Sequence, residues 1–307
     1  MSNCVSVVIP VHNAAAWLGT LLESVSKQVN VTIQIVIIDD GSTDDSALIA
    51  EDFRRNHSEI EMLYVRQDNR GVASARNLGI SKASHDWVAL VDSDDVWFQE
   101  KLSKQIRFAE SFGLNAVATG YVMFRDSSNQ IVGTVFPDWS KKAVFDWLLM
   151  RRYGGLLSST LLIKKTVFDQ VGFFSPTLSL SADVEFAWRL VNHTKVGVVR
   201  EVLVAYRLRL NQMHKNQTLL LEEAERMISL VPVLDFSVNS KSLKSNLLLR
   251  LGLYNLISRN FSDCRVFLIR SARTDLSEFC TTLIRISINR LKLRMRRLFA
   301  TRTLKFP

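Results

Sequence analysis

Short apolar segments alternate with helical patterns through the first hundred residues of this chain. Residues 5–9, 33–38 and 87–91 are mostly aliphatic, and the intervals between them carry apolar residues at helical spacing, as at Trp17, Leu18, Leu21, Leu22 and Val25. Nearly continuous apolar strands that alternate with helices are typical of a parallel sheet whose two faces are covered by helices. The pattern therefore predicts an α/β fold.

Polar residues follow each of these apolar segments. His12 and Asn13 follow the first, Asp40 ends the second, and Asp92 and Asp94 follow the third. In open parallel sheets, ligands bind in the crevice beyond the carboxyl ends of the strands. We therefore expect the three clusters to converge on one binding site.

The run Asp92-Ser93-Asp94-Asp95 is the most acidic of these clusters. Unpaired charge is very costly to bury, so the three carboxylates are expected at the sheet edge, in water or around a cation. Clustered carboxylate oxygens suit Mg²⁺ or Mn²⁺. The same four residues also fit ordinary loop and helix-cap chemistry. On this segment alone both interpretations stay open.

The positive charge of the chain is concentrated at its end. The 307 residues have a formal charge of +9, and residues 281–307 contain eight Lys and Arg side chains and no Asp or Glu. Three widely spaced cysteines provide no disulfide framework, which favours a reducing compartment. We expect no signal peptide, because the chain does not start with a basic region and Pro10, His12 and Asn13 interrupt the first apolar stretch. We expect no transmembrane helix, because no apolar stretch approaches about 20 residues.

Three regions are predicted from these patterns: an α/β domain over residues 1–215, a helical appendage over 216–280, and a basic amphipathic helix over 281–307. In the last region Ile284, Ile288, Leu291 and Met295 recur at three- and four-residue intervals among the cations. A helix of this kind is typical of an interfacial membrane anchor. A helix packed on the body and a phosphate-binding RNA contact are the alternatives.

Seven short motifs occur in order along the first two thirds of the chain. They are SVVIPVHN at 6–13, VIIDDGSTD at 36–44, GVASARN at 71–77, VDSDD at 91–95, VGFF at 171–174, DVEF at 183–186 and YR at 206–207. With these motifs the chain resembles the family 2 glycosyltransferases of the GT-A fold over roughly residues 4–210. The implied fold is Rossmann-like, with a mostly parallel sheet flanked by helices, here followed by a C-terminal helical extension.

The resemblance implies transfer of a sugar from a nucleoside-diphosphate donor, here expected to be a UDP-sugar, to an acceptor hydroxyl with inversion. It further implies a glycan or lipid-linked acceptor, as in bacterial surface polysaccharide synthesis. We expect a cytoplasmic protein that contacts the inner face of the cell membrane through residues 281–307 and binds no nucleic acid.

The resemblance also assigns roles to individual residues. Asp94 is the expected ligand of Mn²⁺ or Mg²⁺, and Asp183 is the expected base that deprotonates the acceptor. Asp95 is either a supporting group behind the metal or a helix cap. The residues expected to bind the nucleotide-sugar are Pro10, His12, Asn13, Asp40, Arg76, Asp92, Ser93 and Arg209.

Three positions depart from the family pattern. His12 stands where an aromatic residue is common, Ala182 where the first acid of an acidic pair is usual, and Arg209 where many relatives have His. Arg209 can hold a phosphate as a cation but cannot ligate a metal. Glu185 is the fallback base, although an exposed helical position is its more ordinary role.

Two other classes of function compete with a transferase. The changes at Ala182 and Arg209 fit a non-catalytic relative that binds sugar nucleotides or glycans. The basic end of the chain fits a nucleic-acid-binding protein. A dinucleotide oxidoreductase is disfavoured, because no G-x-G-x-x-G follows the first strand.

Overall fold

The computed structural model describes residues 3–148, 156–179, 181–209, 223, 226, 240–257 and 261–284. The chain forms two compact units, one of residues 1–140, 155–210 and 302–307, the other of residues 141–154 and 211–301. The predicted boundary at residue 215 and most of the basic region 281–307 lie outside the described residues, so these limits stay predictions.

One sheet of nine strands forms the centre of the first unit, as far as the described residues show. Its order is β3-β2-β1-β4-β8-β6-β9-β5, with β7 paired to β6. The strands are β1 (Cys4–Val11), β2 (Thr32–Asp40), β3 (Glu61–Gln67), β4 (Trp87–Leu90), β5 (Val96–Trp97), β6 (Ala116–Arg125), β7 (Ile131–Val135), β8 (Leu162–Lys164) and β9 (Val196–Leu208).

The long pairings of this sheet are parallel. Strand β1 runs parallel to both β2 and β4, and Val8 lies opposite Val36 on one side and Leu90 on the other. Strands β2 and β3, and β6 and β9, are also parallel. The antiparallel pairing of β7 with β6 extends over four residues, and those of β8 with β4 and β6, and of β5 with β9, over two or three residues each. The predicted mostly parallel sheet flanked by helices is confirmed.

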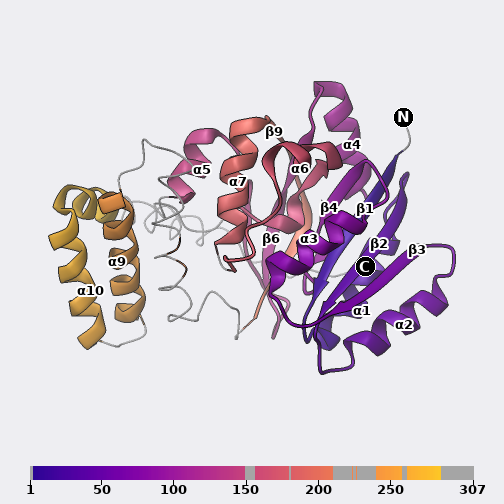
Figure 1. Ribbon diagram of the computed structural model, residues 1–307, viewed down its shortest axis with the longest axis horizontal. Helices are drawn as coiled ribbons and strands as arrows, with labels where there is room; N and C mark the ends of the chain where they lie inside the picture. Colours follow the sequence, from indigo (N-terminus) through magenta and orange to yellow (C-terminus); the bar gives the residue numbers. More distant parts are fainter. Residues whose placement is uncertain are drawn as a thin grey trace. The chain divides into compact units, whose positions relative to one another are not determined.

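Helices cover both faces of the sheet. The helices of the first unit are α1 (Ala15–Ser26), α2 (Ser46–Asn56), α3 (Val72–Lys82), α4 (Lys101–Phe112), α6 (Lys165–Val171) and α7 (Ala182–His193). Figure 1 shows α3 in front of β1 and β2. Gly79 of α3 lies so close to this face that an added Cβ would be 2.3 Å from Val8. On the opposite face Leu22 of α1 and Ile106 of α4 share a core with Val7 of β1.

Two elements differ from the sequence-based expectation. Helix α4 was not predicted, although Leu102, Ile106 and Ala109 form its buried stripe. Residues 159–163 have a pattern that favours a strand, but strand β8 begins only at Leu162, because residues Ser158–Thr160 form the short 3-10 helix η1. The hydroxyl groups of η1 bond to neighbouring backbone and side chains, a tendency that competes with strand pairing.

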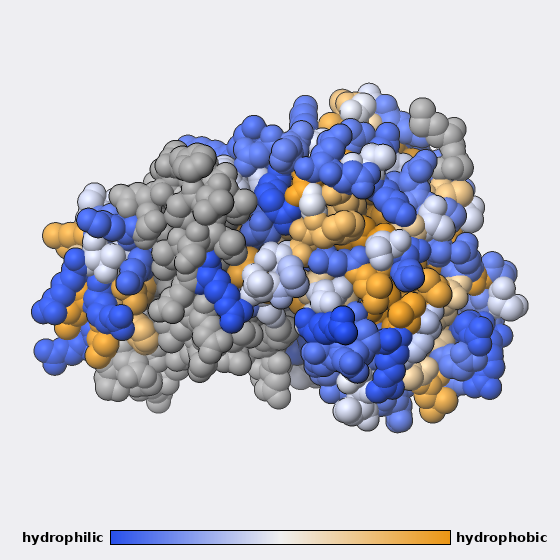
Figure 2. Space-filling view, in the orientation of Figure 1, coloured by the Kyte–Doolittle hydropathy of each residue, from blue (hydrophilic) through white to orange (hydrophobic). Residues whose placement is uncertain are grey.

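In the second unit, α5 (Lys141–Leu148) precedes a helical hairpin of α9 (Ser240–Ile257) and α10 (Phe261–Thr274). Gly252 permits close packing there, since an added Cβ would be 2.6 Å from Leu268. Figure 2 shows apolar and hydrophilic residues side by side on the face of the hairpin that it displays. Val266 and Ile269 of α10 are exposed. Within the described part of the chain, no helix combines the length and apolarity needed to cross a membrane.

Candidate active site

The carboxyl end of β2 organises the first part of the site through Asp40. This side chain is 4% exposed, and its two oxygens accept hydrogen bonds from the backbone N–H groups of Arg70 and Gly71, each at 2.8 Å. The side chain of Gln67 donates a further hydrogen bond to Asp40 at 2.7 Å. Asp40 therefore shapes the loop between β3 and α3.

The preceding residue, Asp39, holds the turn that follows β2. It accepts hydrogen bonds from the Ser42 backbone N–H at 2.7 Å and from the Tyr64 hydroxyl at 2.5 Å. Burial alone would raise the pKa of Asp39, but these hydrogen bonds outweigh it and lower the pKa below its ordinary value. Asp39 is thus kept ionised as a structural acceptor.

Residues at the end of β1 form the neighbouring lip. Pro10 is buried at the register of Ile38, while His12 and Asn13 are exposed. His12 Nδ1 lies 2.9 Å from the Asp40 carbonyl oxygen. Asn13 adopts a left-handed conformation (φ 50°), and its side-chain oxygen accepts a hydrogen bond from Thr43 N–H at 2.8 Å. The lip is held by backbone contacts that leave the His12 ring at the surface.

Gly71 marks the entry into α3. Its φ of +87° lies in the region that glycine tolerates best, and no atom lies within 4 Å of an added Cβ, so conformation and not crowding favours glycine here. The helix that follows carries Arg76 on its second turn. The Gly71 backbone, which is hydrogen-bonded to Asp40, therefore fixes the start of α3 and with it the position of the Arg76 side chain.

Arg76 joins two acidic residues that are far apart in the sequence. One of its terminal nitrogens donates to Asp92 and the other to Asp183, each at 2.6 Å. The Arg76 side chain is 4% exposed, whereas the two carboxylates are 27% and 29% exposed. Burial alone would lower the pKa of Arg76, but the charges of Asp183 and Asp92 outweigh this effect and raise the pKa of Arg76. The buried cation is thus compensated by two part-exposed anions.

Asp183 lies in the first turn of α7. Burial raises the pKa of its carboxyl group, with the charge of Asp92 acting in the same direction, while Arg76 and the Ser158 hydroxyl oppose the rise. The approach to α7 is fixed to α3 through Asn77, which exchanges two hydrogen bonds with the backbone of Phe174, at 2.8 and 2.9 Å. Arg76 therefore holds Asp183 directly, while the next residue, Asn77, holds the Phe174 backbone in the segment before α7.

Asp94 faces a second arginine. Its carboxylate lies 2.7 Å from Arg209 Nε, and the Arg209 guanidinium lies over the Trp17 ring, 4.4 Å from its centre. Burial, together with the nearby charge of Asp92, raises the pKa of Asp94 to about 6. Trp17 was expected only as a core residue of α1, and no feature of its helical spacing marks it as a neighbour of Arg209.

Asp95 points away from the open site and into the protein. It is 1% exposed, accepts a hydrogen bond from the Ser159 hydroxyl at 2.5 Å, and accepts another from the Arg207 backbone N–H at 3.2 Å. Burial and the charges of Asp94 and Asp92 raise the pKa of Asp95 well above its usual range. Asp95 therefore connects the acidic run to β9.

Sequence reasoning missed Ser159 as a supporting residue. Besides donating to Asp95, its hydroxyl accepts a hydrogen bond from the Asp92 backbone N–H at 3.1 Å. Its carbonyl oxygen accepts from the Trp97 indole at 3.0 Å. The three consecutive hydroxyl residues 158–160 are the signal that could have identified it, because such clusters favour turns and side-chain contacts.

Glu185, the fallback base, is occupied elsewhere. It is buried, not exposed as its helical position suggested, and it forms two hydrogen bonds with Arg189 at 2.6 and 2.8 Å. Arg189 also donates to the carbonyl oxygens of Val171 and Phe173. Glu185 therefore anchors the 171–174 segment to α7, and Asp183 is the acid of this helix that borders the acidic run.

Asp92 and Asp94 are the residues of the site that could bind a divalent cation. Within the described ranges, no three His, Cys, Asp or Glu side chains gather into an all-protein metal cage. Asp92 and Asp94 lie close enough for the charge of one to raise the pKa of the other. Two neighbouring carboxylates fit Mg²⁺ or Mn²⁺ in phosphate sites, where substrate oxygens and water complete the coordination.

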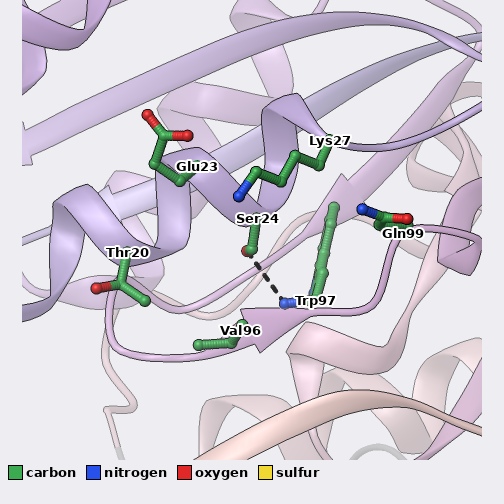
Figure 3. Close-up of a pocket in the computed structure, with 7 residues that line it drawn as sticks. All are labelled: Thr20, Glu23, Ser24, Lys27, Val96, Trp97 and Gln99. Atoms are coloured by element: carbon green, nitrogen blue, oxygen red, sulfur yellow. Dashed lines mark hydrogen bonds between the residues drawn. The ribbon is translucent and has the colours of Figure 1, made fainter. Parts of the chain in front are cut away.

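A separate cavity of about 250 Å³ lies between the second half of α1 and β5 (Figure 3). Ser24 accepts a hydrogen bond there from the Trp97 backbone N–H. None of the predicted site residues lines this cavity, which is bordered by Thr20, Glu23, Ser24, Lys27, Val96, Trp97 and Gln99.

The fold and the acidic edge of the sheet define a GT-A-like α/β protein. Residues 6–175 match the family model described as Glycosyl transferase family 2, and the chain belongs to this family. The match includes Asp40, Arg76 and the acidic run, while Asp183 and Arg209 lie beyond it.

Bacterial proteins are among the relatives. An uncharacterized glycosyltransferase of Rickettsia bellii is 36% identical over 141 residues, which cover 43% of this chain and 20% of the relative. Glycosyltransferase GlyG of Streptococcus pneumoniae is 29% identical over 184 residues, which cover 56% of this chain and 60% of the relative. The chain thus spans less than two thirds of the length of both proteins.

Solved structures share the fold at low identity. S. aureus TarS 1-349 in complex with UDP-GlcNAc has a TM-score of 0.61 at 18% identity, covering 92% of this chain and 80% of the other. The mannosyltransferase PcManGT from Pyrobaculum calidifontis, in complex with GDP-Man and Mn²⁺, has a TM-score of 0.56 at 14% identity, covering 95% and 82%. At these identities the likeness extends to the fold alone.

Proposed function

We propose that this glycosyltransferase moves a sugar from a UDP-sugar to an acceptor hydroxyl with inversion, and that Asp183 is the general base. The observation that carries the proposal is the Arg76 bridge, because it places Asp183 beside Asp92 at the acidic edge. TarS complexes with UDP and UDP-GlcNAc support the choice of UDP.

The proposed step needs one proton acceptor. Asp183 takes the proton of the acceptor hydroxyl while that oxygen bonds to the anomeric carbon, and the bond from this carbon to the diphosphate breaks on the opposite side. A raised pKa makes Asp183 a stronger base than a free aspartate, and general-base assistance contributes about 10²–10⁴-fold. The leaving UDP carries the developing negative charge.

The donor is proposed to lie along the ends of β1, β2 and β4. The exposed His12 and Asn13 border the uracil, with Pro10 behind them. Asp40 and Arg76 shape the nucleotide pocket through the contacts described above. Ser93, which is half-buried within the acidic run, and Arg209 are proposed to contact the phosphate side.

Asp94 is proposed to hold Mn²⁺ or Mg²⁺, and the neighbouring Asp92 is proposed to contact the donor. When bound, such a cation offsets negative charge on the diphosphate. The structure supports this role through the adjacency of the two carboxylates, and the Mn²⁺ complex of PcManGT supports it within the fold. Removal of divalent cations with EDTA should lower UDP release, and readdition of Mn²⁺ should restore it.

A panel of UDP-sugars tests the central proposal. We expect UDP release from at least one of them, and NMR of the transferred sugar should show an anomeric configuration opposite to that of the donor. Retention would contradict the inverting role of Asp183. UDP binding without release from any donor would instead favour the non-catalytic alternative.

The structure weakens one reason for that alternative. Ala182, the first residue of α7, is fully buried and so does not face the site. Asp183 is part-exposed beside Arg76. The position that borders the acidic run therefore keeps its carboxylate.

We further propose a glycan or lipid-linked acceptor in bacterial surface glycan synthesis and a place at the inner face of the cell membrane. The bacterial relatives and the basic residues of 281–307 support this proposal. Co-sedimentation with vesicles that contain anionic lipid should be strong for the full chain and weak after deletion of residues 285–307.

A further inference from the structure

The two arginines of the site hold their carboxylates in different ways. Arg76 is 4% exposed and is fixed between Asp92 and Asp183. Arg209 is 31% exposed, has Asp94 as its carboxylate partner at 2.7 Å, and rests on the face of Trp17. Arg209 also directly follows the last residue of β9, Leu208. Of the two guanidinium groups, Arg209 is the one that is placed to exchange partners.

The ion pair between Arg209 and Asp94 occupies a carboxylate oxygen that a cation could also use. Asp94 Oδ2 lies 2.7 Å from Arg209 Nε, and the Asp94 side chain is only 9% exposed. The Asp94 backbone is held separately, because its carbonyl oxygen accepts from Arg207 Nε at 2.8 Å. Displacement of Arg209 would therefore free the carboxylate without moving the chain that carries it.

A diphosphate provides the other partner for Arg209. Guanidinium groups bind phosphate oxygens with paired hydrogen bonds. Stacking on an aromatic face orients the planar guanidinium and removes water from one of its sides. Because Trp17 supports the guanidinium from one side, Arg209 can turn from Asp94 to a phosphate while it keeps its aromatic contact.

We propose that Arg209 competes with a divalent cation for Asp94, and that a nucleoside diphosphate relieves this competition by taking Arg209 as its own partner. Cation and donor then bind with positive coupling, and Arg209 is the residue that couples them. This inference rests on the donor site in the proposed function.

Coupling between two ligands is reciprocal, so UDP must raise the affinity for Mn²⁺ by the same factor by which Mn²⁺ raises the affinity for UDP. Typical coupling factors are about 5–150-fold. A cation bridging Asp94 and the diphosphate would add coupling of its own. The part that belongs to Arg209 is therefore the difference between the wild-type chain and a variant in which the Arg209 charge is absent.

The test measures Mn²⁺ binding to the full chain by EPR of the free ion, with and without UDP, in wild type and in Arg209→Gln. We expect Mn²⁺ alone to bind the variant about tenfold more tightly than the wild type, and the coupling factor to fall by about tenfold. Arg200→Gln, an exposed change on the same strand β9, is the matched control and should behave as wild type.

Arg209→Lys provides a second variant that keeps the positive charge. It should retain more of the coupling than Arg209→Gln, and equal behaviour of the two variants would overturn the electrostatic cause. Thermal unfolding of each variant checks that it is folded.

Two failures can be told apart. UDP binding by the wild type, with the same Mn²⁺ affinity and coupling in Arg209→Gln, would overturn this inference alone. An absence of UDP binding by the wild type would overturn the proposed donor site and the inference together.

Discussion

The donor edge and the base are held in place by different means. Asp40 ends β2 and the acidic run follows β4, two strands that both pair with β1, so backbone pairing sets their positions. Asp183 lies on a helix more than eighty residues further along, and side-chain contacts from Arg76 and Ser158 set its position. The donor edge should therefore depend on loop backbone, and the base on single side chains.

The largest expected effect is at the base. Asp183→Asn keeps the size of the side chain but removes its basicity, so kcat should fall by about 10²–10⁴-fold. UDP affinity, measured by calorimetry, should stay within about twofold, below 0.5 kcal/mol. Asp169→Asn, an exposed change on the preceding helix α6, serves as the control. A kcat near the wild-type value would remove Asp183 from the reaction.

At the donor edge, Asp40→Ala should weaken donor binding and stability together. It deprives the N–H groups of Arg70 and Gly71 of their acceptor, which costs about 1–3 kcal/mol. We expect UDP binding to weaken by about tenfold and the thermal midpoint to fall. Asp68→Ala changes an exposed carboxylate in the same loop and should alter neither quantity. Equal effects of both variants would refute the loop role of Asp40.

The link between the two parts is tested by the pH dependence of Arg76→Gln. A general base must be ionised, so kcat falls as the pH drops through its pKa. Arg76 holds the pKa of Asp183 below the value that burial alone would give. Its removal should move the acidic limb of the pH–kcat profile to higher pH. An unmoved limb in a folded variant would mean that Arg76 does not act through Asp183.

The smallest effect is expected at Asp95. Burial favours its uncharged form, and its partners are a hydroxyl and a backbone N–H. Asp95→Asn should therefore keep kcat at neutral pH within about threefold, below 1 kcal/mol in the barrier. A loss of a hundredfold or more in a steady-state assay would place Asp95 in direct contact with substrate or metal.

Strands β1, β2 and β4 were predictable, because each is a short apolar run that follows or precedes a helical pattern. The ends of those strands also placed Asp40 and Asp92 at the same edge of the sheet, on either side of β1. Strand β5 was not predictable in this way, since it contains two residues and pairs with a distant strand. Periodicity has no length over which to act in such elements.

Side-chain pairings at the site were the least predictable part. The sequence does not indicate that Arg76 spans Asp92 and Asp183, or that Arg209 rests on Trp17, because these contacts depend on the three-dimensional arrangement of distant elements. The same limit explains why Glu185 was expected at the surface, whereas Arg189 and the 171–174 segment enclose it.

Asn77 and Arg76 fasten the segment before α7, and Asp183 itself, directly onto α3. Asp183 is therefore tied to the same helix that begins at the Gly71 turn, where Asp40 accepts its backbone hydrogen bonds. A displacement of α3 would carry the base with it, so a change at the nucleotide side can reach the reacting side through one rigid helix.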